Sequence, residues 1–190
     1  MGKIVVSEQI SLDGVVDDPS GDDGTSRGGW FNEMTQADRE TWTQHEFAES
    51  VAAEALLLGR RSDAWFATRW RERKGEWADR LNTMPKYVVS STLDEPQWGN
   101  ATVLCGDVVE QVAKLRTEAN GEIVVYASAS LVRMLIDHDL VDELRLTVHP
   151  VVVGAGPRLW GDTADRKAFR LTDSRLLGNL PHLTFEAVAA

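Results

Sequence analysis

EALLLGRRSDAWF, residues 54–66, is the stretch that decides the fold class of this chain. It contains four consecutive apolar residues, Ala55 to Leu58, and then places Gly59 before two adjacent arginines, Arg60 and Arg61. An unbroken apolar run of this kind is typical of a strand covered on both faces, as in parallel sheets. Paired arginines directly behind such a strand indicate either the solvated start of a helix or the docking point of an anion.

Similar runs recur along the chain and predict further strands. They cover residues 3–10, 55–58, 86–91, 101–105, 122–127 and 144–154. Two more segments, AFRLTDSRLL (168–177) and HLTFEAV (182–188), alternate better between apolar and polar residues and flank the turn sequence GNLP. That combination predicts a β-hairpin at the C-terminal end.

Helical patterns lie between these strands. Thr35 with Asp38 resembles a capping pair that opens a helix through about residue 52. Residues 107–121 begin with another such pair and end in glycine, and a third helix follows the serine-rich turn at residues 128–130. Strands that alternate with helices predict an α/β fold with a mainly parallel sheet and an antiparallel hairpin at its end.

Composition limits the class of protein. A length of 190 residues suits a single domain over residues 1–190. The net charge of -10 and the lack of a basic stripe argue against a nucleic-acid partner. Cys105 is the only cysteine, so no internal disulfide is possible and a cytoplasmic location is expected. No segment approaches the ~20 apolar residues of a membrane span, so no membrane partner is expected.

Two other classes of site are not expected. The histidines lie on four different predicted elements without a cysteine or HxxxH partner, so we predict no metal site; they are His45, His138, His149 and His182. The GAG sequence at residues 154–156 lacks the third glycine of a dinucleotide fingerprint and predicts a turn.

Three strand-to-helix junctions carry groups that suit an anion. In open α/β sheets ligands bind at the carboxyl ends of the strands. The junctions are Gly59-Arg60-Arg61-Ser62, Ser90-Ser91-Thr92 and Ala127-Ser128-Ala129-Ser130. Arginine forms bidentate bonds to phosphate, and small residues at a helix N-terminus leave backbone N–H groups free for a diphosphate. Serine is also simply a good N-cap, so each junction alone is weak, but together they predict a nucleotide cradle.

Four segments carry a resemblance to a known family. They are SLDG (11–14), LLLGRRS (56–62), KYVVSSTL (86–93) and VVYASASLVRMLIDHDLVDELRLTVHPVVVGAGPRLW (124–160). On these residues the chain resembles the bacterial dihydrofolate-reductase-like proteins, which are related to the reductase domain of the bifunctional riboflavin-biosynthesis deaminase–reductase. The deaminase motif HxE…PCxxC cannot be built with one cysteine, so a pyrimidine reductase of this kind would act without an attached deaminase.

The resemblance implies a three-layer fold with a twisted, mostly parallel central sheet, and NADPH as cofactor across the carboxyl ends of the central strands. It implies that the adenosine 2′-phosphate end meets Gly59, Arg60, Arg61, Ser62, Ser90 and Ser91. The diphosphate would meet Ala127, Ser128, Ala129, Ser130 and Leu131, and the nicotinamide would lie near residues 10–16. The paired arginines of the opening stretch would then hold the phosphates of the cofactor.

Two residues depart from the family pattern. Ala127 stands where relatives often have glycine, and its methyl group is harmless at negative φ but strained at positive φ. Thr35 stands five positions after Trp30, where dihydrofolate reductases tend to have an acidic residue. The second departure argues against folate itself as the substrate.

The leading interpretation is an NADPH-dependent reductase of a small pterin- or pyrimidine-like heterocycle. The alternative is a catalytically silent nucleotide-binding protein of the same fold, acting as a sensor or interaction partner; a plain dimerisation domain is a third possibility. Trp30 and Trp42 are predicted to wall the substrate pocket, although core packing would also explain such tryptophans. A homodimer is expected from the resemblance and from the long apolar segment at residues 141–154.

Reduction of a C=N or C=O group also needs a proton donor. A carboxylate serves at neutral pH only if burial raises its pKa. Asp13 lies nearest to the expected nicotinamide contact, although it would equally suit a turn aspartate. On the first predicted helix Glu46 lies on the face that borders the 11–34 loop. We therefore predict Asp13 and Glu46 as the catalytic carboxylates.

Overall fold

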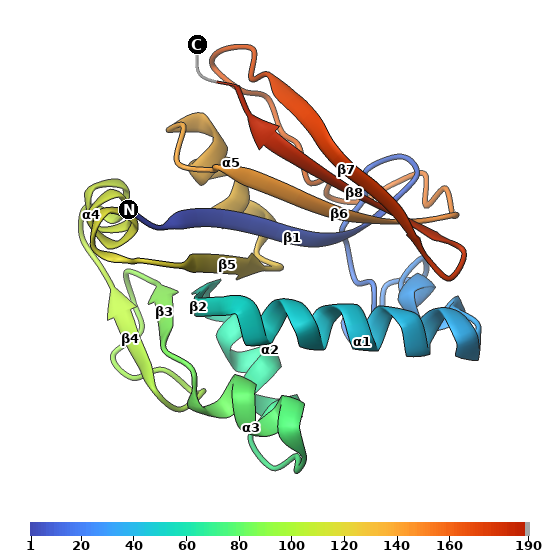
Figure 1. Ribbon diagram of the computed structural model, residues 1–190, viewed down its shortest axis with the longest axis horizontal. Coiled ribbons are helices and arrows are strands. Elements are labelled where there is room, and N and C mark those ends of the chain that lie inside the picture. The colour runs from blue at the N-terminus through green and yellow to red at the C-terminus, as the bar shows by residue number, and fades with distance from the viewer. Residues whose placement is uncertain (189–190) are drawn as a thin grey trace.

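Eight strands form one sheet in the computed structural model, which describes residues 1–188 (Figure 1). They are β1 (Lys3–Ser11), β2 (Ala53–Gly59), β3 (Lys86–Val89), β4 (Ala101–Leu104), β5 (Glu122–Tyr126), β6 (Glu143–His149), β7 (Phe169–Leu177) and β8 (Leu180–Ala187). Their order is β4-β3-β2-β5-β1-β6-β8-β7. Strands β1 to β6 pair in parallel, whereas β8 runs antiparallel to β6 and to β7. The predicted parallel sheet with a C-terminal antiparallel hairpin is confirmed.

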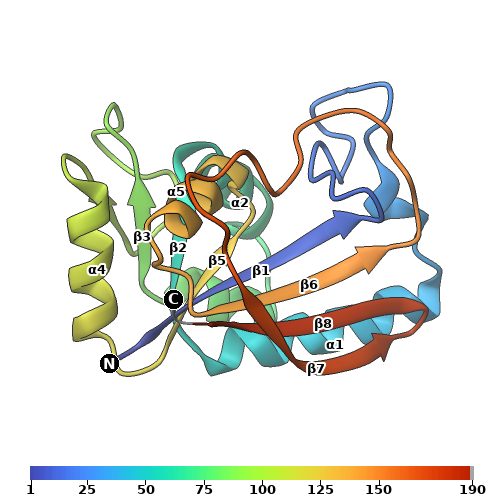
Figure 2. The same cartoon turned by 90° about the horizontal axis from the view of Figure 1, so that it is seen from above.

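Helices cover both faces of the sheet and make the three predicted layers (Figures 1 and 2). They are η1 (Trp30–Glu33), α1 (Gln36–Ala52), α2 (Arg60–Trp70), α3 (Glu76–Thr83), α4 (Val108–Glu118) and α5 (Ala129–Asp137). Helices α4 and α5 lie on one face, and α1, α2 and α3 lie on the other. In β1, Ile4 and Val6 point into the first core layer and Val5 into the second. Because both faces are buried, the strands are continuously apolar there.

The helix ends follow the predicted capping residues closely. The Thr35 hydroxyl accepts from the backbone N–H of Asp38 at 3.2 Å, and the Asp38 carboxylate accepts from the N–H of Thr35 at 3.3 Å. This reciprocal pair starts α1 where the sequence predicts it. Helix α4 ends at Glu118 rather than at Gly121, because Ala119 already takes an extended conformation.

The segment at residues 141–154 differs from its interpretation as an exposed edge or face. Strand β6 ends at His149 and lies between β1 and β8, so its apolar residues are explained by central burial. The open edges are β4 and β7, and β7 exposes Leu171 (51%) and Leu176 (67%). Central burial therefore explains the apolar residues of β6, whereas Val152, in the same predicted segment, is 67% exposed. The dimer itself stays a prediction, which light scattering against the 21.1 kDa chain mass would test.

One end of α1 is fastened to the C-terminal hairpin. The Asp38 carboxylate accepts from the backbone N–H of Asn179 at 2.7 Å and from its side-chain amide at 3.1 Å. Asn179 lies in the turn between β7 and β8. This contact fixes α1 across the face of β1, β6 and β8. In residues 1–188 no helix is long and apolar enough to cross a membrane.

Candidate functional site

Two of the predicted junctions are joined at the carboxyl ends of β2 and β5. The hydroxyl of Ser128 accepts from the backbone N–H of Gly59 at 2.9 Å and lies 2.5 Å from the hydroxyl of Ser62. A Cβ atom at Gly59 would lie only 2.9 Å from the Ser128 hydroxyl oxygen. A side chain at residue 59 would therefore push the Ser128 hydroxyl out of its present position between the two junctions.

The turn after β5 has an unusual backbone. Ala127 and Ser128 have φ values of 57° and 70°, both in the left-handed region. Because the Ser128 hydroxyl bonds Gly59, it does not cap α5, and the first N–H groups of α5 have no side-chain cap. Successive N–H groups in such a turn suit an anion. Ala127 is the departure from glycine noted in the sequence, and here it falls at a positive φ, where its methyl group is strained.

Of the remaining predicted cradle residues, one stabilises its own turn and three are exposed to solvent. The Ser90 hydroxyl accepts from the N–H groups of Thr92 and Leu93 at 3.2 and 3.1 Å, so it shapes its own turn. Arg60 is exposed and donates to the Thr92 hydroxyl at 3.0 Å. Arg61 and Ser91 are also exposed. Two guanidinium groups and a hydroxyl thus remain accessible to an anionic ligand.

A separate polar site lies under α1, on the opposite side of the sheet from α4 and α5. Gln9 of β1 donates to the Glu46 carboxylate at 3.3 Å, and its carbonyl oxygen lies 3.0 Å from Nε2 of His149, the last residue of β6. The Trp30 ring packs edge-on against His149 at 4.9 Å between centroids. Phe31 lies between the His149 and Trp42 rings, at 5.7 and 4.9 Å.

This arrangement brings together Glu46, Trp30 and Trp42, all of which the sequence predicts for the substrate side. The Glu46 side chain is 6% exposed. Burial, reinforced by the nearby charge of Glu49, raises the pKa of Glu46 well above its ordinary value. Burial also lowers the pKa of His149 to about 4, so this imidazole is neutral at pH 7. Glu46 is therefore a buried carboxyl that keeps its proton to higher pH than an ordinary glutamate does.

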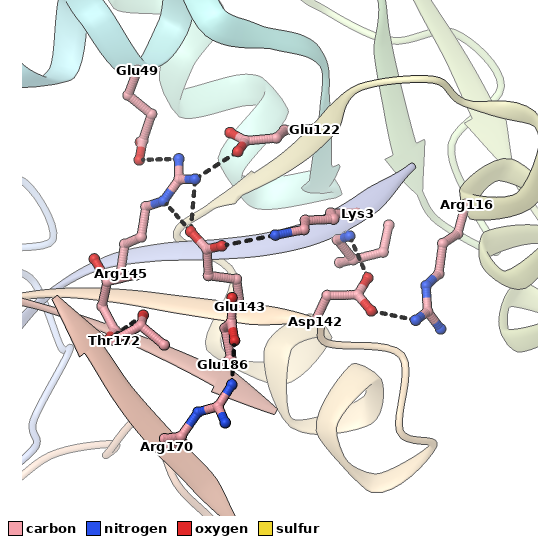
Figure 3. Close-up of polar contacts among 12 residues, drawn as sticks. Lys3, Glu49, Arg116, Glu122, Asp142, Glu143, Arg145, Arg170, Thr172 and Glu186 are labelled. Atoms are coloured by element: carbon pink, nitrogen blue, oxygen red, sulfur yellow. Dashed lines mark hydrogen bonds and ion pairs between the residues drawn. The ribbon is translucent and has the colours of Figure 1, made fainter. Parts of the chain in front are cut away.

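Arg145 of β6 binds three carboxylates next to this site (Figure 3). It donates to Glu49 of α1 at 3.0 Å, to Glu122 of β5 at 2.7 Å and to Glu143 of β6 at 2.7 Å. Lys3 also approaches Glu143, at 3.4 Å. Only 15% of the Arg145 side chain is exposed. Such a buried guanidinium is tolerated because every side of it meets an acceptor.

The contacts of Asp13 argue against its predicted role as a catalytic acid, which itself stays a prediction. Its carboxylate accepts from the Ser11 hydroxyl at 2.7 Å and from the N–H groups of Val153 and Gly154 at 3.1 and 2.9 Å. These bonds lower the pKa of Asp13 to about 2. A proton donor at neutral pH needs the opposite shift, so Asp13 braces the loop after β6 instead.

Residues that the sequence interpretation missed complete the α1 face. They are Gln9, Tyr126, Arg145, Thr147 and His149. The missed signal is a polar residue at every second position of the two strands: Ser7, Gln9 and Ser11 in β1, and Arg145, Thr147 and His149 in β6. A period of two places such residues on one face of the sheet.

A cavity of about 290 Å³ adjoins this site between α1 and strands β6, β8 and β7. His45 and Glu49 line it from α1, and His182 and Thr184 line it from β8. None of the cradle residues lines it. Within residues 1–188 no cluster of three or more His, Cys, Asp or Glu side chains could hold a metal ion.

Comparison with known proteins gives consistent matches. The family model described as the RibD C-terminal domain matches residues 2–183. "Uncharacterized protein YyaP" of Bacillus subtilis (strain 168) is 35% identical over 95 residues, which are 50% of this chain and 50% of that relative.

Two solved structures show the shared fold. A Shewanella sp. PV-4 protein, named provisionally for riboflavin biosynthesis, aligns with a TM-score of 0.71 and 19% identity over 98% of this chain and 99% of that one. Dihydrofolate reductase from Enterococcus faecalis, solved with NADP(H), aligns with a TM-score of 0.59 and 14% identity over 98% and 97% of the two chains.

Proposed function

The chain belongs to the RibD C-terminal domain family, and on this premise we propose that it is an NADPH-dependent reductase of a small pterin- or pyrimidine-like heterocycle. One observation carries the proposal. Tyr126, the residue before the cradle turn, pairs in register with Ser7 of β1. Gln9, which bonds Glu46, follows Ser7 by two residues, or about 7 Å along the strand. The cradle turn at the end of β5 and the Glu46 carboxyl bonded to β1 thus belong to two neighbouring strands.

The residues of the chain divide the chemistry between these two places. Arg60, Arg61 and the N–H groups at the start of α5 would hold the phosphates of NADPH, which supplies a hydride when bound. Glu46 would deliver its proton to the substrate heteroatom, become a carboxylate and recover a proton from water. The rings of Trp30 and Trp42 would wall a planar substrate.

Cofactor choice tests the cradle. Replacing Arg60 and Arg61 with alanine should weaken NADPH binding about 100-fold and NADH binding much less, because a 2′-phosphate is what two guanidinium forks can hold. Tryptophan-fluorescence titration would measure both affinities. The matched control is the double variant Arg166→Ala and Arg170→Ala, which removes the same charge from exposed positions outside the cradle. Equal losses for NADPH and NADH, or equal losses in both double variants, would contradict this assignment.

Turnover tests the reductase itself. A panel of dihydropterins, pyrimidines and quinoid compounds should contain one that oxidises NADPH in the presence of the protein. Glu46→Gln should then keep NADPH affinity and lose turnover, by about 100-fold for loss of a general acid. NADPH binding without turnover of any compound would instead favour the silent nucleotide-binding protein.

A further inference from the structure

Glu46 and Glu49 form a pair of buried carboxyls on α1, and the role inferred for them rests on the proposed function. The two residues lie three positions apart, on one face of the helix, and each is 6% exposed. Two buried carboxylates so close to each other cannot both remain charged without cost. Their partners therefore decide which of them keeps the proton.

The partners differ sharply. Glu49 accepts from the guanidinium of Arg145 at 3.0 Å, a charge-assisted bond to a group that is always charged. Glu46 accepts from the neutral amide of Gln9, at 3.3 Å, and the neutral indole of Trp42 is its other neighbouring donor. An environment that separates two carboxylates in this way assigns one to carry charge and the other to carry a proton.

We propose that Arg145 and Glu49 are positioning residues of the reductase: their ion pair fixes a buried negative charge one helical turn from Glu46, so that Glu46 holds the proton for the substrate. The same charge acts on Tyr126, which ends β5 beside the cradle turn and faces α1. Burial and the charges of Glu49 and Glu46 raise the pKa of Tyr126 well above its ordinary value. Tyr126 therefore remains a hydrogen-bond donor at the edge of the site.

Charged groups on the neighbouring elements support the same assignment. Glu122 and Glu143 also bind Arg145, so the cluster of three carboxylates around one guanidinium keeps a net negative charge even with Lys3 beside it. From α1 and β8, His45 and His182 face the cavity beside Glu49.

The two histidines add no positive charge at neutral pH. Burial lowers the pKa of His45, and it lowers the pKa of His182 to about 4. On β7, Asp173 and Arg175 pair with each other and largely cancel. Glu8 of β1 adds a weaker effect of the same sign as Glu49 on the pKa of Glu46.

The direct test follows the ionisation of both carboxyls by NMR of protein labelled with ¹³C at the glutamate side-chain carboxyl. Glu46→Gln and Glu49→Gln identify the two signals. In the wild type at pH 6, Glu46 should be protonated. In Glu49→Gln the midpoint of Glu46 should fall by about one pH unit or more, because a nearby negative charge is gone.

Glu40→Gln is the matched control, since it removes one carboxylate from an exposed position of the same helix and should leave the Glu46 midpoint unchanged. The inference is overturned if Glu46 is already ionised at pH 6 in the wild type. It is also overturned if Glu49→Gln and Glu40→Gln have equal effects. The wild-type measurement needs only Glu46→Gln, which identifies the Glu46 signal. A poorly folded Glu49→Gln protein therefore does not prevent the test.

The titration separates this inference from the reductase proposal. Failure of NADPH binding or turnover would contradict the proposed function and leave the titration result standing. A wrong protonation pattern would contradict the positioning role and leave the cradle standing. Once a substrate is found, the high-pH limb of the rate profile should move to lower pH in Glu49→Gln but not in Glu40→Gln.

Discussion

The cradle and the polar layer under α1 use opposite physical strategies within one sheet. In the cradle the charged groups Arg60 and Arg61 are exposed, and the geometry is set by the backbone turn at Ala127 and Ser128. Under α1 the charged groups are buried, and the precision lies in bonds between side chains, with Arg145 as the centre.

This difference predicts whether the loss of a charged group reduces ligand affinity or the stability of the fold. An exposed charge is screened by water and salt, so its removal should cost little stability and mainly reduce ligand affinity. A buried charge that loses its partner should cost stability directly, because the remaining group stays desolvated. Four predictions, ordered by expected size, test this contrast.

The largest effect is expected at Arg145. Arg145→Met should lower the free energy of unfolding by about 3 to 5 kcal/mol, because it leaves three carboxylates without their shared cation. Urea unfolding followed by circular dichroism would measure it. Arg170→Met is the control, since its ion pair with Glu186 is exposed and should be worth less than about 1 kcal/mol. Similar losses in both variants would contradict the contrast.

The second effect is a pH dependence at His149. Its pKa is about 4 in the folded protein and near 6.5 in the unfolded chain, so the unfolded state binds the extra proton between these values. The stability due to neutral His149 is present above pH 6.5 and is lost as the pH falls toward 4. Relative to His149→Gln, the wild type should lose about 2 to 3 kcal/mol between pH 7 and pH 4.

Unfolding curves of both proteins at several pH values would show this trend. The difference between the two proteins cancels the opposite contribution of buried carboxyls such as Glu46. His138→Gln, at an exposed residue after α5, should follow the wild type throughout. A constant difference between wild type and His149→Gln across the pH range would count against a neutral, buried imidazole.

The third effect separates bracing from catalysis at Asp13. Asp13→Asn should make the loop at residues 150–158 open more readily, because the bonds from Val153 and Gly154 lose their charged acceptor. Hydrogen exchange of these two amides would report the change. NADPH-dependent turnover should keep the pH profile of the wild type. A selective loss of turnover at high pH, with protection unchanged, would restore the acid role.

The smallest effect is expected in the cradle. Ala127→Gly should raise the free energy of unfolding by about 0.5 to 1 kcal/mol, because glycine accepts a φ of 57° without strain. Ala129→Gly, at the first residue of α5, should have the opposite sign, since it adds a glycine to a helix. Thermal unfolding of the two variants would compare them directly. Destabilisation in both would show that the turn at Ala127 is not strained.

The cradle was accessible to sequence interpretation because each of its parts is local. A strand, a glycine and a helix start occupy neighbouring residues in LLLGRRS, and the serine-rich turn follows EIVVY directly. What the sequence left open was the conformation of Ala127 and the tie between Ser128 and Gly59, residues 69 positions apart. Backbone strain and a contact over such a separation depend on packing, which residue types alone do not specify.

The layer under α1 was predicted only in part. Glu46, Trp30 and Trp42 follow from helix spacing and composition, whereas Gln9, His149 and Arg145 come from strands that meet α1 only after the sheet has formed. Asp13 is a second case in which contacts between distant residues could not be predicted from the sequence. Its place in SLDG is clear from the chain, but its bonds to Val153 and Gly154, 140 and 141 residues away, lower its pKa and so argue against a role as an acid.

The sequence by itself therefore determined the α/β architecture and the family, and it located the junctions that we propose to hold phosphate, because these depend on local periodicity and on short motifs. Only the tertiary structure decided which carboxyl can hold a proton. Glu46 and Asp13 are the same kind of group in the chain. Burial beside the charge of Glu49 raises the pKa of one, and hydrogen bonds from a distant loop lower the pKa of the other. The protonation of a carboxyl is set by its neighbours in space.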